Sequence, residues 1–260
     1  MAQESSSFVQ PVTILSLTGI PLIQPGDDLP GVILKALERM QCPLVNGDVL
    51  VVTSKIVSKA EGRFFDLRDV VPSAEAESLA QETEKDPRLV ELVLQESADI
   101  SRKGHRVLIT RHRLGFVSAN AGIDQSNVDE GGERVLLLPV DPDHSADVIR
   151  QALFTATGVE VGIVISDTHG RPFRMGNVGV AVGVAGIPSI LDLRGETDLF
   201  GRVLRITTQG YADLVASAAH LVCGEGDEGL PVTLVRGLRY PAAMGTASEL
   251  NRPPELDLYR

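Results

Sequence analysis

The stretch Val161-Gly-Ile-Val-Ile-Ser-Asp-Thr168 decides which type of fold we expect for this chain. Its first five residues form an apolar run, which is typical of a buried strand. The run ends at polar side chains, and we expect Asp167 and Thr168 to lie in a short turn where the strand stops. A second apolar run, Val49-Leu-Val-Val-Thr53, is also typical of a buried strand. Carboxylates at the ends of such strands are well placed to hold a hard divalent cation, often together with a nucleotide phosphate.

Strand-like and helix-like segments alternate along the rest of the chain, which predicts a mixed α/β (α+β) fold with no internal repeat. We predict a flexible lead at residues 1–10, one unit at 11–240 with room for two interleaved subdomains, and a tail at 241–260. The predicted strands cover 12–17, 49–53, 106–111, 135–138, 161–165, 203–208 and 231–235. The predicted helices cover 32–40, 74–84, a segment that follows the cap Asp86, a segment capped by Ser145 that stops at Gly158, and 211–223.

Composition excludes several classes of function. The chain has 260 residues and a net charge of −11, which argues against a nucleic-acid surface but not against an anionic substrate held through divalent ions. No apolar run approaches the roughly 20 residues of a membrane helix, and the first residues lack the pattern of a secretory signal. Cys42 and Cys223 form no metal-ligand spacing and no disulfide framework, so we expect a cytoplasmic protein.

The segment Asn120-Ala-Gly-Ile-Asp-Gln-Ser-Asn127 adds a second carboxylate, Asp124, in a Gly-containing turn. The amide of Asn127 can hydrogen-bond a base, a ribose or a phosphate. After Thr168, Arg171 and Arg174 offer guanidinium groups that suit phosphate or carboxylate. A purely structural role for these turns stays open, and residues 129–132 are predicted to form a solvated turn. His169 is predicted to be a turn residue outside the chemistry.

The segment Gly224-Glu-Gly-Asp-Glu-Gly229 fits G-x-G-x-x-G, but a helix precedes it and a strand follows it. A dinucleotide-binding Rossmann motif needs the opposite order, so that fold is not expected. Gly224 taken alone is better explained as a helix C-cap, although Glu225 could supply a metal oxygen. The chain also lacks the P-loop motif. In the segment Ser54–Arg63, Lys55 and Lys59 would share one helix face and are candidate phosphate partners.

Together these segments resemble the F420-0:gamma-glutamyl ligase family, the coenzyme F-420:L-glutamate ligases. The markers that carry the resemblance span about residues 13–238. In chain order they are Gly19-Ile-Pro-Leu-Ile23, Ser54-Lys-Ile-Val-Ser-Lys-Ala-Glu-Gly62, Asn120 to Asn127, Ser166-Asp-Thr168 with Gly170-Arg171, and Gly224-Glu-Gly226. The resemblance implies a two-subdomain ligase fold with mixed sheets in an intertwined homodimer, in the form without a nitroreductase-like domain.

The resemblance further implies that GTP, a divalent ion (two Mg or Mn ions) and K serve a reaction that joins L-glutamate to the lactyl carboxylate of a deazaflavin precursor. Some members add further γ-linked glutamates. Transfer of the GTP γ-phosphoryl group would give an acyl phosphate, which the glutamate amine attacks. One departure from the family pattern, Asp227-Glu228, leaves the path of its loop open.

The resemblance also implies a role for each matching residue. The implied catalytic residues are Asp124, Asp167 and Lys59, and the implied metal ligands are Asp124, Asp167, Thr168 and Glu225. The implied nucleotide contacts are Ile20, Pro21, Leu22, Ile23, Ser54, Lys55, Lys59, Asn127, Cys223, Gly224, Glu225, Gly226, Asp227, Glu228, Gly229 and Leu230. Two other functions remain alternatives: a regulatory protein that binds nucleotide and metal without turnover, and a metal-dependent phosphohydrolase.

Overall fold

The computed structural model describes residues 11–128 and 131–257. The predicted lead at residues 1–10, and Asp129 and Glu130 of the predicted turn, therefore lie outside the described residues. Within the described ranges, no helix combines the length and the apolar character needed to cross a membrane.

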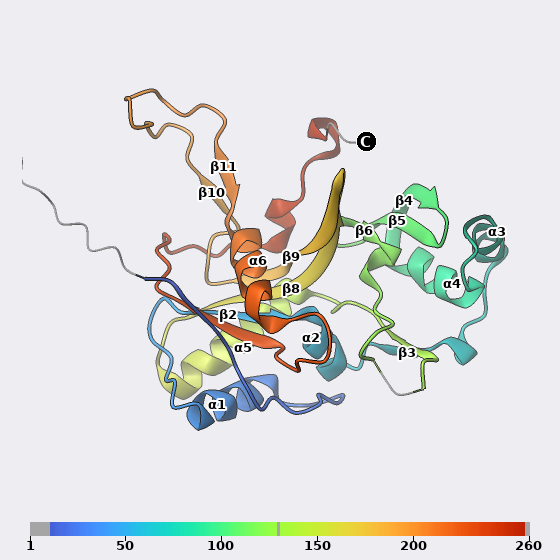
Figure 1. Ribbon diagram of the computed structural model, residues 1–260, viewed down its shortest axis with the longest axis horizontal. Helices are drawn as coiled ribbons and strands as arrows, with labels where there is room; N and C mark the ends of the chain where they lie inside the picture. The colour runs from blue at the N-terminus through green and yellow to red at the C-terminus, as the bar shows by residue number, and fades with distance from the viewer. Residues whose placement is uncertain (1–10, 129–130, 258–260) are drawn as a thin grey trace, which may run out of the picture.

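A five-stranded mixed sheet forms the centre of the molecule (Figure 1). One neighbouring pair, β2 and β8, runs parallel, and the other pairs run antiparallel. In order across the sheet the strands are β1 (Thr13–Ser16), β12 (Val232–Arg236), β2 (Val49–Thr53), β8 (Gly162–Arg171) and β9 (Arg174–Ala185). This mixed order confirms that the fold is neither a Rossmann fold nor a P-loop fold.

Helices cover both faces of the central sheet. On one face, α1 (Leu29–Arg39) and α5 (Pro142–Thr157) pack against side chains such as Leu50. On the other face, α6 (Tyr211–Cys223) packs against side chains such as Val49. Successive side chains of a strand point to opposite faces, so a strand buried on both faces reads as a continuous apolar run. This is why β2 and the start of β8 could be recognised from sequence.

A smaller unit lies beside the central sheet, on the right of Figure 1. It contains two helices, a three-stranded antiparallel sheet and a separate pair of strands, and its buried side chains form clusters of their own. Its elements are β3 (Phe64–Asp66), η1 (Leu67–Asp69), α3 (Ala74–Thr83), α4 (Pro87–Glu96), β4 (Ser97–Gly104), β5 (Val107–His112), β6 (Val117–Ala119), η2 (Asn120–Gly122) and β7 (Arg134–Leu136). The chain therefore has a mixed α/β fold, as predicted, with one mixed sheet in the centre and antiparallel sheets beside it.

Two arms project from the central unit toward the top of Figure 1. One is the far end of the β8–β9 hairpin. The other runs between β10 (Ile190–Asp192) and β11 (Thr208–Gly210). Both arms carry apolar side chains that are almost fully exposed: Phe173, Met175, Leu199, Phe200 and Ile206.

The segment after β12 returns to the central unit and includes two short turns, η3 (Ala247–Leu250) and η4 (Pro254–Leu256). The backbone N–H of Ala247 donates to Asp143 at the start of α5. The side-chain amide of Asn251 donates to the carbonyl of Leu114 in the smaller unit. These hydrogen bonds connect residues of the predicted tail to both units.

Several predicted elements are confirmed. The strand at 49–53 and the helix at 211–223 have the predicted bounds. The helix after Asp86 begins at Pro87, and the Asp86 side chain accepts a hydrogen bond from the N–H of Arg88. Such a side chain satisfies one of the N–H groups left free in the first turn of a helix.

Other predictions were wrong. The strand predicted to stop at Ile165 continues to Arg171, because β9 pairs with it along this length and satisfies its backbone. Asp167 and Thr168 therefore lie within a strand and not in a turn. The cap of α5 is Asp141, which accepts from the N–H of His144, and not Ser145. Pro142 then occupies the first turn, where its missing N–H costs nothing.

Two further errors concern strands: one predicted in the second half of the chain, and one missed in the smaller unit. The strand predicted at 203–208 was wrong: of these residues only Thr208 lies in a strand, β11, which pairs with β10 in the projecting arm. The strand β4 was missed, because its polar and mostly exposed residues lack the alternation of a half-buried strand. Pairing with β5, not composition, makes this segment extended.

Candidate functional site

Four of the five marker segments meet at one edge of the central sheet. The N–H of Leu17 donates to the carbonyl of Val232, and the N–H of Thr53 donates to the carbonyl of Pro231. Thr53 is also paired with Ser166 across the parallel strands. This register places the segments that follow β1 and β2, the loop that precedes β12, and the middle of β8 together. The fifth marker segment, around Asp124, reaches the same edge from the smaller unit.

The helix α2 (Ser54–Ala60) brings the two marker lysines to this edge. The Nζ atom of Lys55 lies 2.8 Å from Oδ1 of Asp124 and also donates to the carbonyl of Ser126 at 3.1 Å. The Nζ atom of Lys59 donates to the carbonyl of Asn127 at 2.7 Å. Residues four apart share one face of a helix, so both ammonium groups reach the same segment of the smaller unit.

The backbone around Asp124 is fixed by two features. Asp124 exchanges two hydrogen bonds of 2.9 Å with Leu136 of β7. Just before it, Gly122 has φ +67°, and a Cβ there would lie 2.8 Å from Leu138 Cδ1 and 3.5 Å from Asp167 Oδ2. The absence of a side chain at Gly122 therefore lets this segment approach Asp167 closely.

Gly122→Ala is expected to lower the free energy of unfolding by about 1–3 kcal/mol, because it adds left-handed strain and a clash with Leu138. It should also displace the Asp167 carboxylate, and it should weaken Mn²⁺ binding if this carboxylate is a ligand, as the resemblance implies. Urea unfolding and a Mn²⁺ titration measure the two effects. Gly158→Ala is the matched control, since Gly158 has φ +71° but no atom within 4 Å of the added Cβ. Equal stability and equal metal affinity of both variants would contradict the close approach.

Three carboxylates from distant parts of the chain act on one another at this edge. Burial raises the pKa of Asp124, the nearby Lys55 lowers it, and the charges of Asp167 and Glu225 raise it again. The approach of like charges in a partly buried place is unfavourable unless a cation neutralises them. Asp124, Asp167 and Glu225 therefore form an acidic cluster that favours a positively charged ligand.

Thr168 and His220 connect Glu225 to the sheet. The hydroxyl of Thr168 donates to Glu225 Oε2 at 3.4 Å. His220 lies with Nδ1 3.2 Å from Glu225 Oε1 and Nε2 3.2 Å from the Ser166 hydroxyl. Sequence reasoning missed His220, because a lone histidine in an apolar helix carries no signal of its own. The glycine at position 179 makes room for this ring, since a Cβ there would collide with it.

His169 also belongs to the site, and its prediction as a turn residue was wrong. It lies in β8, and its Nε2 atom is 3.2 Å from Asp167 Oδ2. Its ring packs on Phe116, with 5.0 Å between ring centroids, and Phe116 in turn stacks on His112. The imidazole therefore holds the Asp167 carboxylate from the side of the smaller unit.

The loop at residues 223–230 is held by a hydrogen bond from its backbone to the side chain of Glu228, a residue of the same loop. Gly224 ends α6 with φ +74°, which confirms its predicted role as a helix C-cap. The N–H of Gly226 donates to Glu228 Oε2 at 2.8 Å, and the Gly226 carbonyl accepts from the amide of Asn127 at 2.9 Å. The loop and the Asn127 segment are thus already joined in this structure.

The predicted nucleotide segment at residues 20–23 is divided between core and surface. Ile23 is buried in the main core and Ile20 packs against it, whereas Pro21 and Leu22 are exposed. Ser54 is buried at the first turn of α2. The exposed pair and the half-buried Ile20 can contact a ligand without rearrangement of the core.

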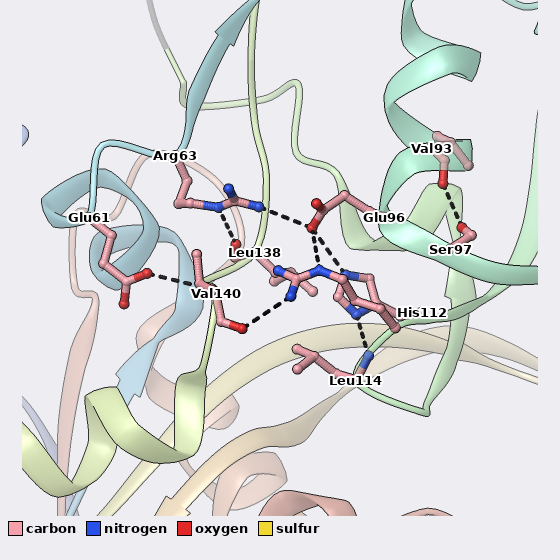
Figure 2. A network of polar contacts seen from close by, with 10 residues as sticks. Glu61, Arg63, Val93, Glu96, Ser97, His112, Leu114, Leu138 and Val140 are labelled. Atoms are coloured by element: carbon pink, nitrogen blue, oxygen red, sulfur yellow. Dashed lines mark hydrogen bonds and ion pairs between the residues drawn. The ribbon is translucent and has the colours of Figure 1, made fainter.

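A buried ion-pair network centred on Glu96 lies in the smaller unit, where the chain enters it after α2 (Figure 2). Glu96 at the end of α4 accepts from Arg63 at 3.1 Å and from Arg113 at 3.2 Å, and His112 Nε2 lies 3.5 Å away. Arg63 also donates to the carbonyl of Leu138, the residue that contacts Gly122. The network therefore reaches the backbone of Leu138, which lies beside the segment that carries Asp124.

A cavity of about 190 Å³ adjoins the site, and His169 forms part of its wall. Two of its carboxylates have structural partners. Asp143 accepts from the N–H groups of Val184 and Ala247, and Asp213 accepts from the N–H of Ala181. These carboxylates fasten α5 and α6 to β9.

The donor set of the acidic cluster suits a hard divalent cation, since carboxylate and hydroxyl oxygens are its usual ligands. In the described part of the chain, however, no group of three His, Cys, Asp or Glu side chains is already close enough to hold a metal. The Lys55 ammonium lies 2.8 Å from Oδ1 of Asp124, one of the carboxylate oxygens that such a cation can bind. With two lysines opposite the carboxylates, the edge can bind a polyphosphate together with its cations.

Comparison with known proteins gives extensive matches. The sequence profile of the F420-0:Gamma-glutamyl ligase family matches residues 19–237. The coenzyme F420:L-glutamate ligase of Methanothermobacter thermautotrophicus is 48% identical over 253 residues, 96% of this chain and 99% of that protein. The proteins of the same description from Methanopyrus kandleri and Methanocaldococcus jannaschii are 45% and 44% identical, over 95% and 85% of this chain and 98% and 87% of their own lengths. The matched residues include all the segments that meet at the sheet edge.

Proposed function

The chain belongs to the F420-0:gamma-glutamyl ligase family, as its motifs predicted, and on this basis we propose that it is a GTP-dependent ligase that adds L-glutamate to the lactyl carboxylate of a deazaflavin precursor of coenzyme F-420. The observation that carries the proposal is the meeting of the family's marker segments at one sheet edge, with carboxylates opposite lysines. Further γ-linked additions and a cytoplasmic location belong to the same proposal.

In the proposed complex, the nucleotide phosphates lie against α2 and the loop at 223–230. Lys59, whose pKa is lowered by burial and by the charge of Lys55, offers an ammonium group at this edge. Asn127 and the backbone of the loop complete the cradle, and the exposed residues Pro21 and Leu22 form an apolar wall for the base. Ser54, in the first turn of α2, is a further nucleotide contact in this proposal.

The proposed reaction has two steps. The precursor carboxylate attacks the γ-phosphorus of GTP, which forms an acyl phosphate and releases GDP. The amine of glutamate then attacks the acyl carbon, the C–O bond to phosphate breaks, and the amide forms as the amine loses its proton. Lys59 binds the phosphate oxygens in the first step, and alignment by bound substrates can lower such a barrier by about 7 kcal/mol or more.

The residues present fit a divalent cation by the chemistry of their donors. The ligands of Mg or Mn would be Asp124, Asp167, Thr168 and Glu225. A K ion would bind at a separate position in the same site. When bound, a divalent ion neutralises phosphate charge and aligns the transferred group. His169 and His220 would orient the carboxylates of Asp167 and Glu225.

Mass spectrometry tests the proposed function. Incubation with GTP, Mn²⁺, L-glutamate and the precursor should give a product heavier by one glutamyl unit, and GDP in equal amount. Tight GTP binding without product for any acceptor would favour the regulatory alternative. Phosphate release that does not depend on glutamate would favour the phosphohydrolase.

We also propose that the protein is an intertwined homodimer in which the two arms cover a second copy. Apolar side chains as exposed as Leu199 (99%) and Phe200 (89%) are typical of an interface. Light scattering should give the mass of two chains, and the double variant Leu199→Asp with Phe200→Asp should give the mass of one. Val71→Asp, also at an exposed apolar residue but outside the arms, should leave the mass unchanged. A wild-type mass of one chain at all concentrations would refute the dimer.

A further inference from the structure

Lys55 and Lys59 share one helix face but have different partners. Lys55 is paired with a carboxylate, Asp124, and both side chains are about one-quarter exposed. Lys59 contacts the carbonyl of Asn127, and within residues 11–128 and 131–257 it forms no ion pair. Of these two lysines, only Lys55 therefore forms an ion pair with a member of the acidic cluster.

We propose that Lys55 is an internal substitute for the divalent cation: its ammonium group neutralises the acidic cluster while metal is absent and must leave Asp124 when metal binds. This inference rests on the proposed function, because it concerns the same cation site. It gives a role to the lysine of this helix face that is paired with a carboxylate of the acidic cluster.

The ammonium group of Lys55 occupies a position on Asp124 that a divalent cation can also occupy. Lys55 Nζ lies 2.8 Å from Asp124 Oδ1. A Mg or Ca ion binds carboxylate oxygens at about 2.0–2.6 Å, so an ion on the lone pair of Oδ1 that accepts from Lys55 would be in repulsive contact with the ammonium group. The second hydrogen bond, to the Ser126 carbonyl, holds the ammonium group at this lone pair. An ion at this position therefore requires Lys55 to change its rotamer.

A displaced Lys55 has an obvious second partner. It lies one helical turn from Lys59 on the face that we assign to the nucleotide phosphates. A metal ion that frees Lys55 would thus prepare a second ammonium group for GTP. By linkage, GTP that binds the freed lysine would also strengthen metal binding.

The first test is a titration of the nucleotide-free protein with Mn²⁺, in which electron paramagnetic resonance measures the concentration of free Mn²⁺. Lys55→Met should bind Mn²⁺ about tenfold more tightly than the wild type, a difference of about 1.4 kcal/mol. Lys55→Arg keeps the charge and should stay near the wild type. Lys59→Met removes an equal charge one turn away without breaking a carboxylate pair, so it should change the affinity much less.

The second test needs no variant. Acetylation of the unmodified protein, read by mass spectrometry, should label Lys55 slowly without metal and at least several-fold faster with saturating Mn²⁺. Lys85, which contacts the carbonyl of Arg106 in the smaller unit, provides the internal reference.

The outcomes separate this inference from the proposed function. Equal Mn²⁺ affinity of the wild type and Lys55→Met, or unchanged labelling of Lys55, would overturn the role of Lys55 even if the protein is an active ligase. An equal gain in Lys55→Met and Lys59→Met would also overturn it, since only general charge would then matter. Failure of all proteins to bind Mn²⁺ would overturn the cation site itself.

Discussion

Asp124→Asn and Asp167→Asn are each expected to lower the rate of glutamate addition by about 100-fold or more, which corresponds to about 2.7 kcal/mol in the barrier. Each change keeps the shape of the side chain but removes one charge from the acidic cluster. The ligand set that we propose for the divalent cation would then lose a carboxylate, and Lys55 would lose its partner in the Asp124 variant. Steady-state rates of product formation at saturating GTP and Mn²⁺ measure the effect.

A matched control is Asp99→Asn, a carboxylate paired with Arg111 on the surface of the smaller unit. Its rate should equal that of the wild type. Circular dichroism should show that all three variants are folded, because none of these side chains belongs to the core. Near-normal rates in both site variants would remove Asp124 and Asp167 from the proposed cation site.

Glu96→Ala is expected to lower the free energy of unfolding by about 3 kcal/mol, since removal of one partner from a buried ion pair leaves the others uncompensated. Arg63, Arg113 and His112 all face this carboxylate (Figure 2). This value is the lower end of the range for breaking a buried ion pair, because Arg113 is partly exposed to solvent. Urea unfolding measures the change, and Glu82→Ala, which breaks the exposed pair with Lys103, should have little effect.

The same carboxylate predicts a dependence of stability on pH. Burial alone would raise the pKa of Glu96, but its interactions with His112, Arg113 and Arg63 outweigh burial and lower this pKa from 4.5 to about 2. A lowered folded-state pKa stabilises the protein above the unfolded-state value, and this contribution is lost as pH falls through the folded-state value. The stability difference between wild type and Glu96→Gln should therefore shrink between about pH 4.5 and pH 2. A constant difference across this range would contradict the network.

Much of the central unit could be read from the sequence. Strands buried on both faces, such as β2, appear as apolar runs in the sequence. The end of α6 is indicated by the glycine that follows it, Gly224. The cap at Asp86 follows from the chemistry of its own side chain. The smaller unit was harder, because β4 is extended only through its pairing with β5.

The site divides in the same way. The sequence identified Asp124, Asp167, Lys55 and Lys59 as candidates, because carboxylates, hydroxyls and lysines in short motifs have recognisable chemistry. It did not identify His220, and it placed Asp167 and His169 in a turn instead of a paired strand. It also could not assign different partners to the two lysines of one helix face.

The sequence by itself determined the main apolar strands, the larger helices, the family and the types of ligand that the candidate side chains can bind, since each depends on residues close together in the chain. Only the tertiary structure decided that Lys55 pairs with Asp124, that Asn127 joins the Gly226 loop across 99 positions of sequence, and that Glu96 is shared by Arg63, Arg113 and His112. These contacts depend on the register of the sheets and on how the two units pack. Local patterns of side chains leave that register open in strands such as β2, which are apolar on both faces, because a shifted pairing would bury the same kinds of side chain.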